Sequence, residues 1–584
     1  MYSCILAVAE ALELSILAQG IEDTFHAFTP PDVKKLASIG SYSHNPQNSQ
    51  RDLLTAEFMK SEQLITPDPF VIQAWVFVNS QGMAKVEKVD LSIFLPHEWV
   101  QALHNAGFAD SILGTSSDCR QFWSQVHPMD PKLHKNPMLE VNGWKDKFNP
   151  MLLHADKGPH TKHDSIHTIH MYSLNALDKL LGLDFSSVLL CAIPVQCLVT
   201  EAKCKDLGIK WTKEMEETMK TVGRHLVWSF NCLFDGRAGK RDADGRVYCQ
   251  PGPIADGNHR CILWQAPADC EHLSLEYGLP NYNAIEPCMR CKCNRSNIPW
   301  NDWNDDAKFK ETLITPEAAM KEPLTNHWIM SIKGTSHFTF AYDLMHCGDI
   351  GFSGRSIANC FYDFIYRDPQ FTGTKAQKCQ QIMEMIKAKY DKLGIDDCKI
   401  QRLLLQHFLP DKGSPHKHSP DLMHSAIKAK QTNKLIPVVA AICADLPRVS
   451  IYARHRYHCM QHLNLMYQVS SRNGMFLPKV EAELFENSAK RFLKHYDALS
   501  KLSVRAGSKQ WHQTPKFHFL CHIAEDAFFL NPRAIWCYPG EHMVGNATSL
   551  AQSCLAGLAA YKVPTTLCTK YKIGKHLMLR EQLG

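Results

Sequence analysis

The order of apolar runs between about residues 144 and 280 constrains the fold more than any other feature of the sequence. Three runs follow one another, each bounded by polar turn residues: FNPMLLHAD, DSIHTIHMYSL and VLLCAIPVQCLVT. Their length and their content of β-branched residues are typical of strands. Three such strands in succession predict an antiparallel meander.

A helix, a fourth strand and a second helix are predicted next. In WTKEMEETMKTVGRHLVWSFNCLF, apolar residues recur at helical spacing at Met215, Met219, Val222 and Leu226, and Thr212 is the expected N-cap. RCILWQAPAD then has the composition of a strand, and CEHLSLEYGL that of a helix. This β-β-β-α-β-α order predicts an α/β domain with a mixed sheet, helices on its faces and functional residues at its strand ends.

The chain as a whole divides into four predicted regions. Residues 1–140 mix helical and strand-like patterns, which predicts an α+β N-terminal region without a recognisable chemical motif. Residues 141–350 hold the mixed sheet and a cysteine-rich loop over 286–304. Apolar residues at helical spacing over 351–510 predict a large all-α insertion. Residues 511–584 complete the core and end in a basic tail.

The two ends of the chain add further expectations. MYSCILAVAEALELSILAQG lacks a basic segment and carries Glu10 and Glu13, so we expect an amphipathic helix rather than a secretory signal. Near the other end, PKFHFLCH is interpreted as a strand-like run. A helix is expected to open after Pro539 with Glu541 in its first turn, where an acidic residue is favoured electrostatically.

Composition narrows the functional classes. A chain of 584 residues is too long for one core, and units of ~150 residues would give about three to four domains. The net charge of +5 permits a polyanionic partner without requiring one. The longest apolar stretches are far shorter than the ~20 residues of a membrane span. Twenty-two cysteines, some in C-x2-C spacing, favour a reducing intracellular compartment, and nucleotide-binding glycine motifs are absent.

Two acidic residues stand at predicted strand ends. Asp156 closes the first strand and Asp269 the fourth, so carboxylates that are far apart in the sequence could converge at one edge of the sheet. Each of them alone is also typical of a turn or an N-cap. Their joint placement favours a shared site.

Six short blocks, taken in order, resemble one family. They are HADKG around Asp156, APADCEHLSLEYGLPNY, EPCMRC, DLMH at Asp343 to His346, PKFHFLCH, and WCYPGEHM around Glu541. Over about residues 140 to 560 this series resembles the CACTA-type and related cut-and-paste DDE transposases. The resemblance implies an RNase H-like catalytic core in which a helical insertion separates the glutamate from the second aspartate.

The resemblance also assigns the catalytic acids. Asp156 matches the family's first aspartate and Glu541 its glutamate. Asp269 is the preferred second aspartate, because it ends the fourth strand and precedes the C-x2-C block. Asp343 is the runner-up and otherwise belongs with His346 to the D-x2-H block. Three carboxylates suffice to hold two Mg²⁺ ions, or Mn²⁺, for in-line displacement at phosphorus.

The resemblance therefore predicts a DNA transposase, either active or an inactive genomic copy, that binds transposon ends and target DNA in the nucleus. Assembly into a homo-oligomer is left open, and neither a membrane nor a small organic cofactor is expected. Two alternatives are a transposase-derived protein that binds DNA or chromatin without catalysis, and an RNase H-like nuclease without strand transfer.

Cysteines and histidines offer further candidate ligands. Cys288, Cys291 and Cys293 lie on a tight loop, and His346 or Cys347 could complete a structural Zn²⁺ site; buried free thiols are the alternative. Several histidines also surround the first aspartate without a standard metal-binding spacing, and we expect them to be solvated or to face phosphate. These histidines are His154, His160, His163, His167 and His170.

Basic residues cluster in two places, the loop before the fourth strand and the C-terminal tail. Either group could neutralise DNA phosphates, and ordinary surface charge is the alternative for each. They are Arg237, Lys240, Arg241 and Arg246 in the loop, and Lys562, Lys570, Lys572, Lys575 and Arg580 in the tail.

Overall fold

The computed structural model describes residues 64–80, 83–176, 183–257, 259–409, 419–554 and 558–581. The helix expected over the start of the chain lies outside this part. Among the helices that are described, none is both long and apolar enough to cross a bilayer.

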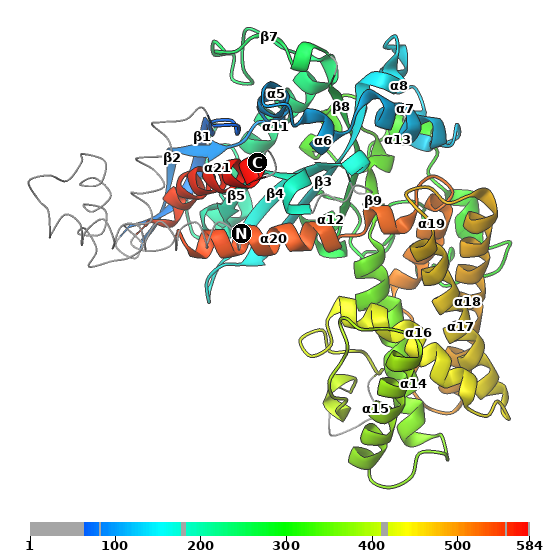
Figure 1. Ribbon diagram of the computed structural model, residues 1–584. Coiled ribbons are helices and arrows are strands. Elements are labelled where there is room, and N and C mark those ends of the chain that lie inside the picture. Colours follow the sequence, from blue (N-terminus) through cyan, green and yellow to red (C-terminus); the bar gives the residue numbers. More distant parts are fainter. Residues whose placement is uncertain are drawn as a thin grey trace, which may run out of the picture.

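A five-stranded mixed sheet forms the centre of the α/β part (Figure 1). Its strands are β3 (Phe148–Pro159), β4 (Ser165–Ser173), β5 (Ser187–Pro194), β8 (Arg260–Ala268) and β9 (Phe340–Tyr342). The first three form the predicted antiparallel meander, because β4 pairs antiparallel with both of its neighbours. β8 pairs parallel with β3, and β9 pairs parallel with β8, which gives the order β5-β4-β3-β8-β9. The prediction of an α/β fold with a mixed sheet is confirmed.

Helix α11 (Thr218–Asp235) connects the meander to β8. The predicted helix exists, but it begins at Thr218, so the expected N-cap at Thr212 is wrong. The preceding segment is held against strand β1 (Phe70–Ser80) instead. The indole N–H of Trp75 donates to the carbonyl oxygen of Glu214 (3.0 Å), and the Thr218 hydroxyl donates to the carbonyl oxygen of Trp75 (2.7 Å). These tertiary hydrogen bonds outweigh the local helical pattern.

The C-terminal segment packs on the N-terminal part of the described chain. β1 forms an antiparallel hairpin with β2 (Met83–Ile93), and helix α21 (Val563–Glu581) lies against β2 and β5 (Figure 1). The buried ammonium group of Lys575 donates to the carbonyl oxygens of Phe185 and Ser187, at 2.7 and 2.9 Å. The expected basic tail is therefore an integral helix of the core.

The predicted all-α insertion is present and lies beside the sheet (Figure 1). It is built mainly from α14 (Ser353–Tyr366), α15 (Lys375–Lys392), α16 (Ala429–Asp445), α17 (Ile451–Arg472) and α18 (Lys479–Arg505). Helix α20 (Tyr538–Gln552), which carries Glu541 in its first turn as predicted, then returns along β3 and β4. The insertion thus separates two parts of the chain that pack against each other.

The segment PKFHFLCH forms the start of helix α19 (Pro515–Asp526), so its interpretation as a strand-like run is wrong. Pro515 takes the first helical position, where a missing backbone N–H loses no hydrogen bond. His518 and His522, four residues apart, consequently share one face of the helix, and both are buried.

Candidate functional site

Three aspartates lie side by side at one edge of the sheet, Asp156 within β3 and the other two directly after β8 and β9. The registers of the β3–β8 and β8–β9 pairs, continued along the chain, place Asp156 level with Asp269 and Asp269 level with Asp343. Asp156 does not end its strand as expected, because β3 continues to Pro159 in its hairpin with β4. It lies beyond the last β3–β8 pair, where the sheet opens.

Asp156 and Glu541 meet at this edge together with His154. One potential ligand atom of each of the three lies within 4.8 Å of the others. His154 and Asp156 project from the same face of β3, because side chains alternate along a strand. Both ring nitrogens of His154 are buried without a hydrogen-bond partner among the described residues. Burial lowers the pKa of this imidazole, which favours its neutral form, and one of its ring nitrogens lies near the two carboxyl groups.

Glu541 and the neighbouring His346 both have raised pKa values. Burial and then the neighbouring charge of Asp156 raise the pKa of Glu541 to about 8. The Nε2 atom of His346 lies 3.5 Å from a carboxyl oxygen of Glu541. Although burial opposes protonation, the hydrogen bond and charge of Asp343 raise the pKa of His346 to about 9. Perturbed carboxyl and imidazole groups in one place are typical of a functional site.

Asp269 and Asp343 differ in how much of their hydrogen-bonding capacity is used. Asp269 caps the short helix α12 (Cys270–Leu275) and accepts one backbone N–H, from His272, at 2.5 Å. Asp343 is fully buried and accepts four donors: the backbone N–H groups of Met345, His346 and Cys537, and the Nδ1 of His346. A carboxylate offers about four lone-pair positions. Asp343 is therefore saturated, whereas Asp269 keeps oxygen lone pairs for a ligand.

Two glycines allow α20 to lie close to β3. A Cβ atom on Gly540 would clash with the ring of His154, and one on Gly158 would clash with the side chain of Thr548. Gly540 directly precedes Glu541 in the chain. The close approach of the two backbones therefore sets how far Glu541 stands from Asp156.

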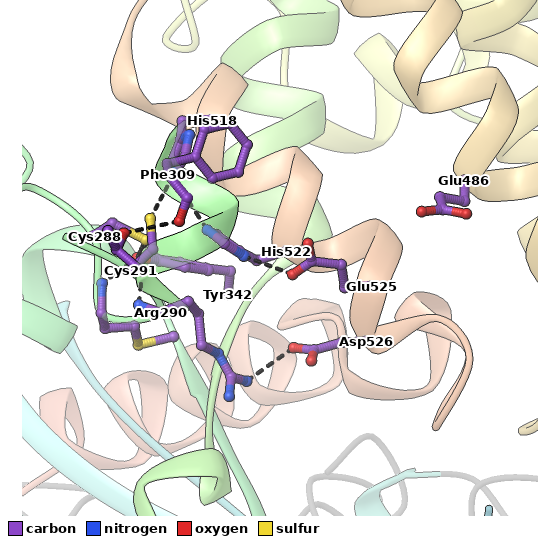
Figure 2. Close-up of polar contacts among 12 residues, drawn as sticks. Cys288, Arg290, Cys291, Phe309, Tyr342, Glu486, His518, His522, Glu525 and Asp526 are labelled. Atoms are coloured by element: carbon purple, nitrogen blue, oxygen red, sulfur yellow. Dashed lines mark hydrogen bonds and ion pairs between the residues drawn. The ribbon is translucent and has the colours of Figure 1, made fainter. Parts of the chain in front are cut away.

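A second group of ligands lies between the cysteine-rich loop and α19 (Figure 2). One ligand atom each of Cys288, Cys291, His518 and His522 falls within 4.8 Å of the others, and all four residues are buried. The Sγ of Cys291 lies 3.2 Å from Nε2 of His518, which lies 3.1 Å from Nε2 of His522. Two thiols and two imidazoles are a common tetrahedral Zn²⁺ set, in which neighbouring ligand atoms lie about 3.3 Å apart or slightly more.

The protons of the two imidazoles can be assigned from their outer partners. Nδ1 of His518 lies 2.9 Å from the carbonyl oxygen of Trp300, and Nδ1 of His522 lies 2.8 Å from a carboxylate oxygen of Glu525. Both oxygens are acceptors, so each Nδ1 carries a hydrogen and donates it. Although burial opposes protonation, the charges of Cys288 and Glu525 raise the pKa of His522 to about 10, so the Nε2–H of His522 can donate to Nε2 of His518. A cation bound by the group would replace that proton. Such outer carbonyl and carboxylate partners commonly orient metal-binding imidazoles.

This group differs from the Zn²⁺ ligand set expected from the sequence. His346 lies with Asp343 and Cys537 instead, and Cys293 is buried nearby but outside the group of mutually close ligand atoms. The sequence reasoning missed His518 and His522 as ligands. The available signal was their spacing of four residues. Two side chains at this spacing lie on the same side in a strand and also on the same face of a helix.

The histidines around Asp156 are less exposed than expected. His154, His160, His167 and His170 are buried, and only His163 is exposed. Burial lowers the pKa of His170 to about 3 and also lowers that of His167. Neutral, buried rings of this kind serve the core, and only His154 joins the two catalytic candidates.

The basic residues are not gathered at the acidic site. The loop that precedes β8 lies at the opposite end of that strand from Asp269. Its basic side chains, those of Arg237, Lys240, Arg241 and Arg246, are all exposed. In the tail, Lys572 and Lys575 are buried, and Lys572 pairs with Asp68. These two lysines serve packing within the core rather than contact with DNA.

No family model matches this chain, and a search of curated proteins finds no significant match.

Proposed function

We propose that this chain is a cut-and-paste DNA transposase of the DDE type, which cleaves DNA and joins a 3′-hydroxyl end to target DNA. The observation that carries the proposal is the meeting of Asp156 and Glu541, which come from β3 and from the far side of a long helical insertion. A chain of this length offers many acidic pairs, but few are half-buried with a raised carboxyl pKa at the open edge of a mixed sheet.

The topology supports an RNase H-like core for this enzyme. A three-stranded meander is followed by a helix and by two strands parallel to β3, so that only β4 runs against the others. The order of acids along the chain also agrees with the transposase resemblance, with the glutamate on a helix that packs across the first two strands.

The residues at the sheet edge fit divalent cations. Asp156 and Glu541, whose ligand atoms lie close together with that of His154, would hold Mg²⁺ or Mn²⁺. Asp269 lies outside this group of mutually close atoms but level with Asp156 in the register, and we propose it as the third ligand. The ring nitrogens of His154 have no hydrogen-bond partner among the described residues. When bound, such ions activate a water or a 3′-hydroxyl and stabilise charge on the leaving oxygen. His346, protonated and held by Asp343, places positive charge beside Glu541, which favours an anionic substrate. We also propose that Cys288, Cys291, His518 and His522 hold a structural Zn²⁺ ion.

The purified full-length protein tests this function directly. Supercoiled plasmid that carries the genomic DNA flanking the gene is incubated with Mg²⁺ or Mn²⁺ and a labelled oligonucleotide with a free 3′-hydroxyl. Metal-dependent nicking together with transfer of the label to plasmid supports the proposal. Nicking without transfer supports a nuclease, and DNA binding without either product supports a non-catalytic DNA-binding protein.

Substitutions at Asp269 and Asp343 distinguish the second catalytic acid. Asn is as good an N-cap as Asp, so Asp269→Asn keeps the cap of α12 and removes only the charge. We expect cleavage to fall by about 10³-fold, a loss of about 4 kcal/mol of transition-state stabilisation, with an unchanged melting temperature. Asp343→Asn places an amide N–H₂ group against N–H groups that now donate to the carboxylate, so that donors face each other in the core. This change should lower the free energy of unfolding by about 2–4 kcal/mol, measured by denaturant unfolding. The reverse pattern would make Asp343 the ligand.

The glycine contact between α20 and β3 offers a matched pair of variants. Gly540→Ala forces α20 away from His154 and moves Glu541, and a displacement of about 1 Å is expected to lower cleavage by about 10²-fold. Gly545→Ala, in the same helix with nothing within 4 Å of the added Cβ, should retain activity. Plasmid nicking rates measure both. Equal activity of the two variants would contradict the argument that the close approach positions Glu541.

A further inference from the structure

Four histidines converge on the surface of the helical insertion, and none of them belongs to either group of ligands described above. His455, His458 and His462 lie three and four residues apart on α17, so they share one face of that helix. The neighbouring helix α18 contributes His495 to the same place. One ring nitrogen each of His458, His462 and His495 lies within 4.8 Å of the others.

The three rings lie close together with nearly parallel planes. The ring centroids of His458 and His495 are 5.1 Å apart and those of His462 and His495 are 5.8 Å apart, with interplanar angles of 19° and 7°. Nδ1 of His455 lies 2.9 Å from Nδ1 of His495, which fixes the orientation of the latter ring. His458 is exposed, whereas His462 and His495 are half-buried. The group is therefore open to solvent on one side.

Burial and neighbouring positive charges lower the pKa of three imidazoles of the cluster, those of His455, His462 and His495. Burial first, and then neighbouring histidines and Arg491, lower the pKa of His462 and of His495 to about 4. Arg454 similarly adds to the lowering for His455. The imidazoles of His462 and His495 are therefore uncharged at neutral pH, and neutral imidazole is the form that binds a metal.

We propose that His458, His462 and His495 form a binding site for a divalent transition-metal ion of the zinc type. All-imidazole sets suit Zn²⁺, Cu²⁺ and Ni²⁺ rather than Mg²⁺, which prefers oxygen ligands. His455 orients the ring of His495, as the outer partners of metal-binding imidazoles commonly do. The ion links α17 to α18 and leaves a fourth position to water. This site does not rest on the proposed DNA chemistry, because its residues lie on α17 and α18, whereas Asp156 and Glu541 lie on β3 and α20.

Metal analysis of the full-length protein tests the site. The protein is stripped with chelator, dialysed against Zn²⁺, and its bound zinc is counted for the wild type and three variants. His458→Gln, which changes an exposed residue, and the double variant His462→Ala/His495→Ala should each bind one equivalent fewer than the wild type. His512→Ala, an exposed histidine in the same helical region, should bind as much as the wild type.

Co²⁺ substitution supplies a second readout that separates this site from the thiol-containing group. Cobalt bound by Cys288 and Cys291 gives thiolate-to-metal charge-transfer absorption, whereas cobalt bound only by imidazoles gives ligand-field bands without it. The His458→Gln variant should lose part of the ligand-field absorption and keep the charge-transfer band. Identical zinc content and identical cobalt spectra in the wild type and the His458→Gln variant would overturn the proposal, as would zinc content unchanged in the double variant.

Discussion

Replacing Asp156 with Asn or Glu541 with Gln is expected to abolish metal-dependent DNA cleavage while raising the melting temperature of the metal-free protein. Each variant removes a carboxylate that would hold the ions, and a loss of about 4 kcal/mol of transition-state stabilisation corresponds to about 10³-fold in rate. The raised pKa of Glu541 reflects burial first and then repulsion by Asp156, and either substitution removes that repulsion between two half-buried carboxyl groups. Plasmid nicking and thermal unfolding measure the two effects.

The repulsion also predicts a pH dependence with a definite sign. The pKa of Glu541 rises from 4.5 to about 8 on folding. Below pH 4.5 the carboxyl group is protonated in both the folded and the unfolded state, so it does not lower the free energy of unfolding. Between pH 4.5 and about 8 the unfolded state loses its proton first, and the free energy of unfolding falls as the pH rises. Above about 8 both states are ionised and this decrease stops. The wild type should therefore lose stability relative to Glu541→Gln between these values, and added Mg²⁺ should reduce the difference.

A matched acidic substitution provides the control. Asp146 lies just before β3 and is paired on the surface with Arg120. Asp146→Asn should change neither cleavage nor the pH profile of stability appreciably, because exposed pairs contribute little. If Asp156→Asn and Glu541→Gln cleave as fast as Asp146→Asn, the proposed catalytic site is wrong.

Substitutions in the proposed zinc site are expected to have the largest effect on stability. The site consists of Cys288, Cys291, His518 and His522. Structural Zn²⁺ sites bind with about 10–16 kcal/mol of apparent free energy, comparable to the whole stability of a typical domain, about 5–15 kcal/mol. Cys291→Ser and His522→Ala should therefore lower the melting temperature by ten degrees or more and release one equivalent of zinc. A strong chelator should do the same to the wild type.

The control for this prediction lies on the same helix. Cys521, between the two histidines, is outside the group of mutually close ligand atoms, so Cys521→Ala should keep the zinc and most of the stability. Purified protein that contains no zinc, or that melts at the same temperature after Cys291→Ser, would show that these residues are only a packed thiol and imidazole cluster.

The strands were predictable because their signal is local. Alternating β-branched runs bounded by turns predicted β3, β4, β5 and β8, and helical periodicity predicted the insertion. Where tertiary contacts compete with local pattern, the predictions were wrong. The segment before Thr218 pairs with Trp75 instead of extending α11, and PKFHFLCH, which has an apolar alternation, folds as a helix around His518 and His522.

The candidate site could be predicted from the sequence less completely than the strands, for a different reason. Which acids meet depends on registers between strands distant in the chain, and on the return of α20 across them. The saturation of Asp343 by four donors could not be read from its D-x2-H block, although it separates the roles of Asp343 and Asp269. Likewise, Cys291 and His518 are 227 residues apart, and nothing local pairs them.

The hydrogen bond from the backbone N–H of Cys537 to Asp343 joins two points 194 residues apart, on either side of the helical insertion, here called the helical lobe. Entry and exit of that lobe therefore coincide, much as in an inserted domain whose termini adjoin. A lobe attached in this way can change length or outer surface over evolution without altering the spacing of the acids. Its contacts with other macromolecules can diversify while the geometry at the sheet edge stays constant.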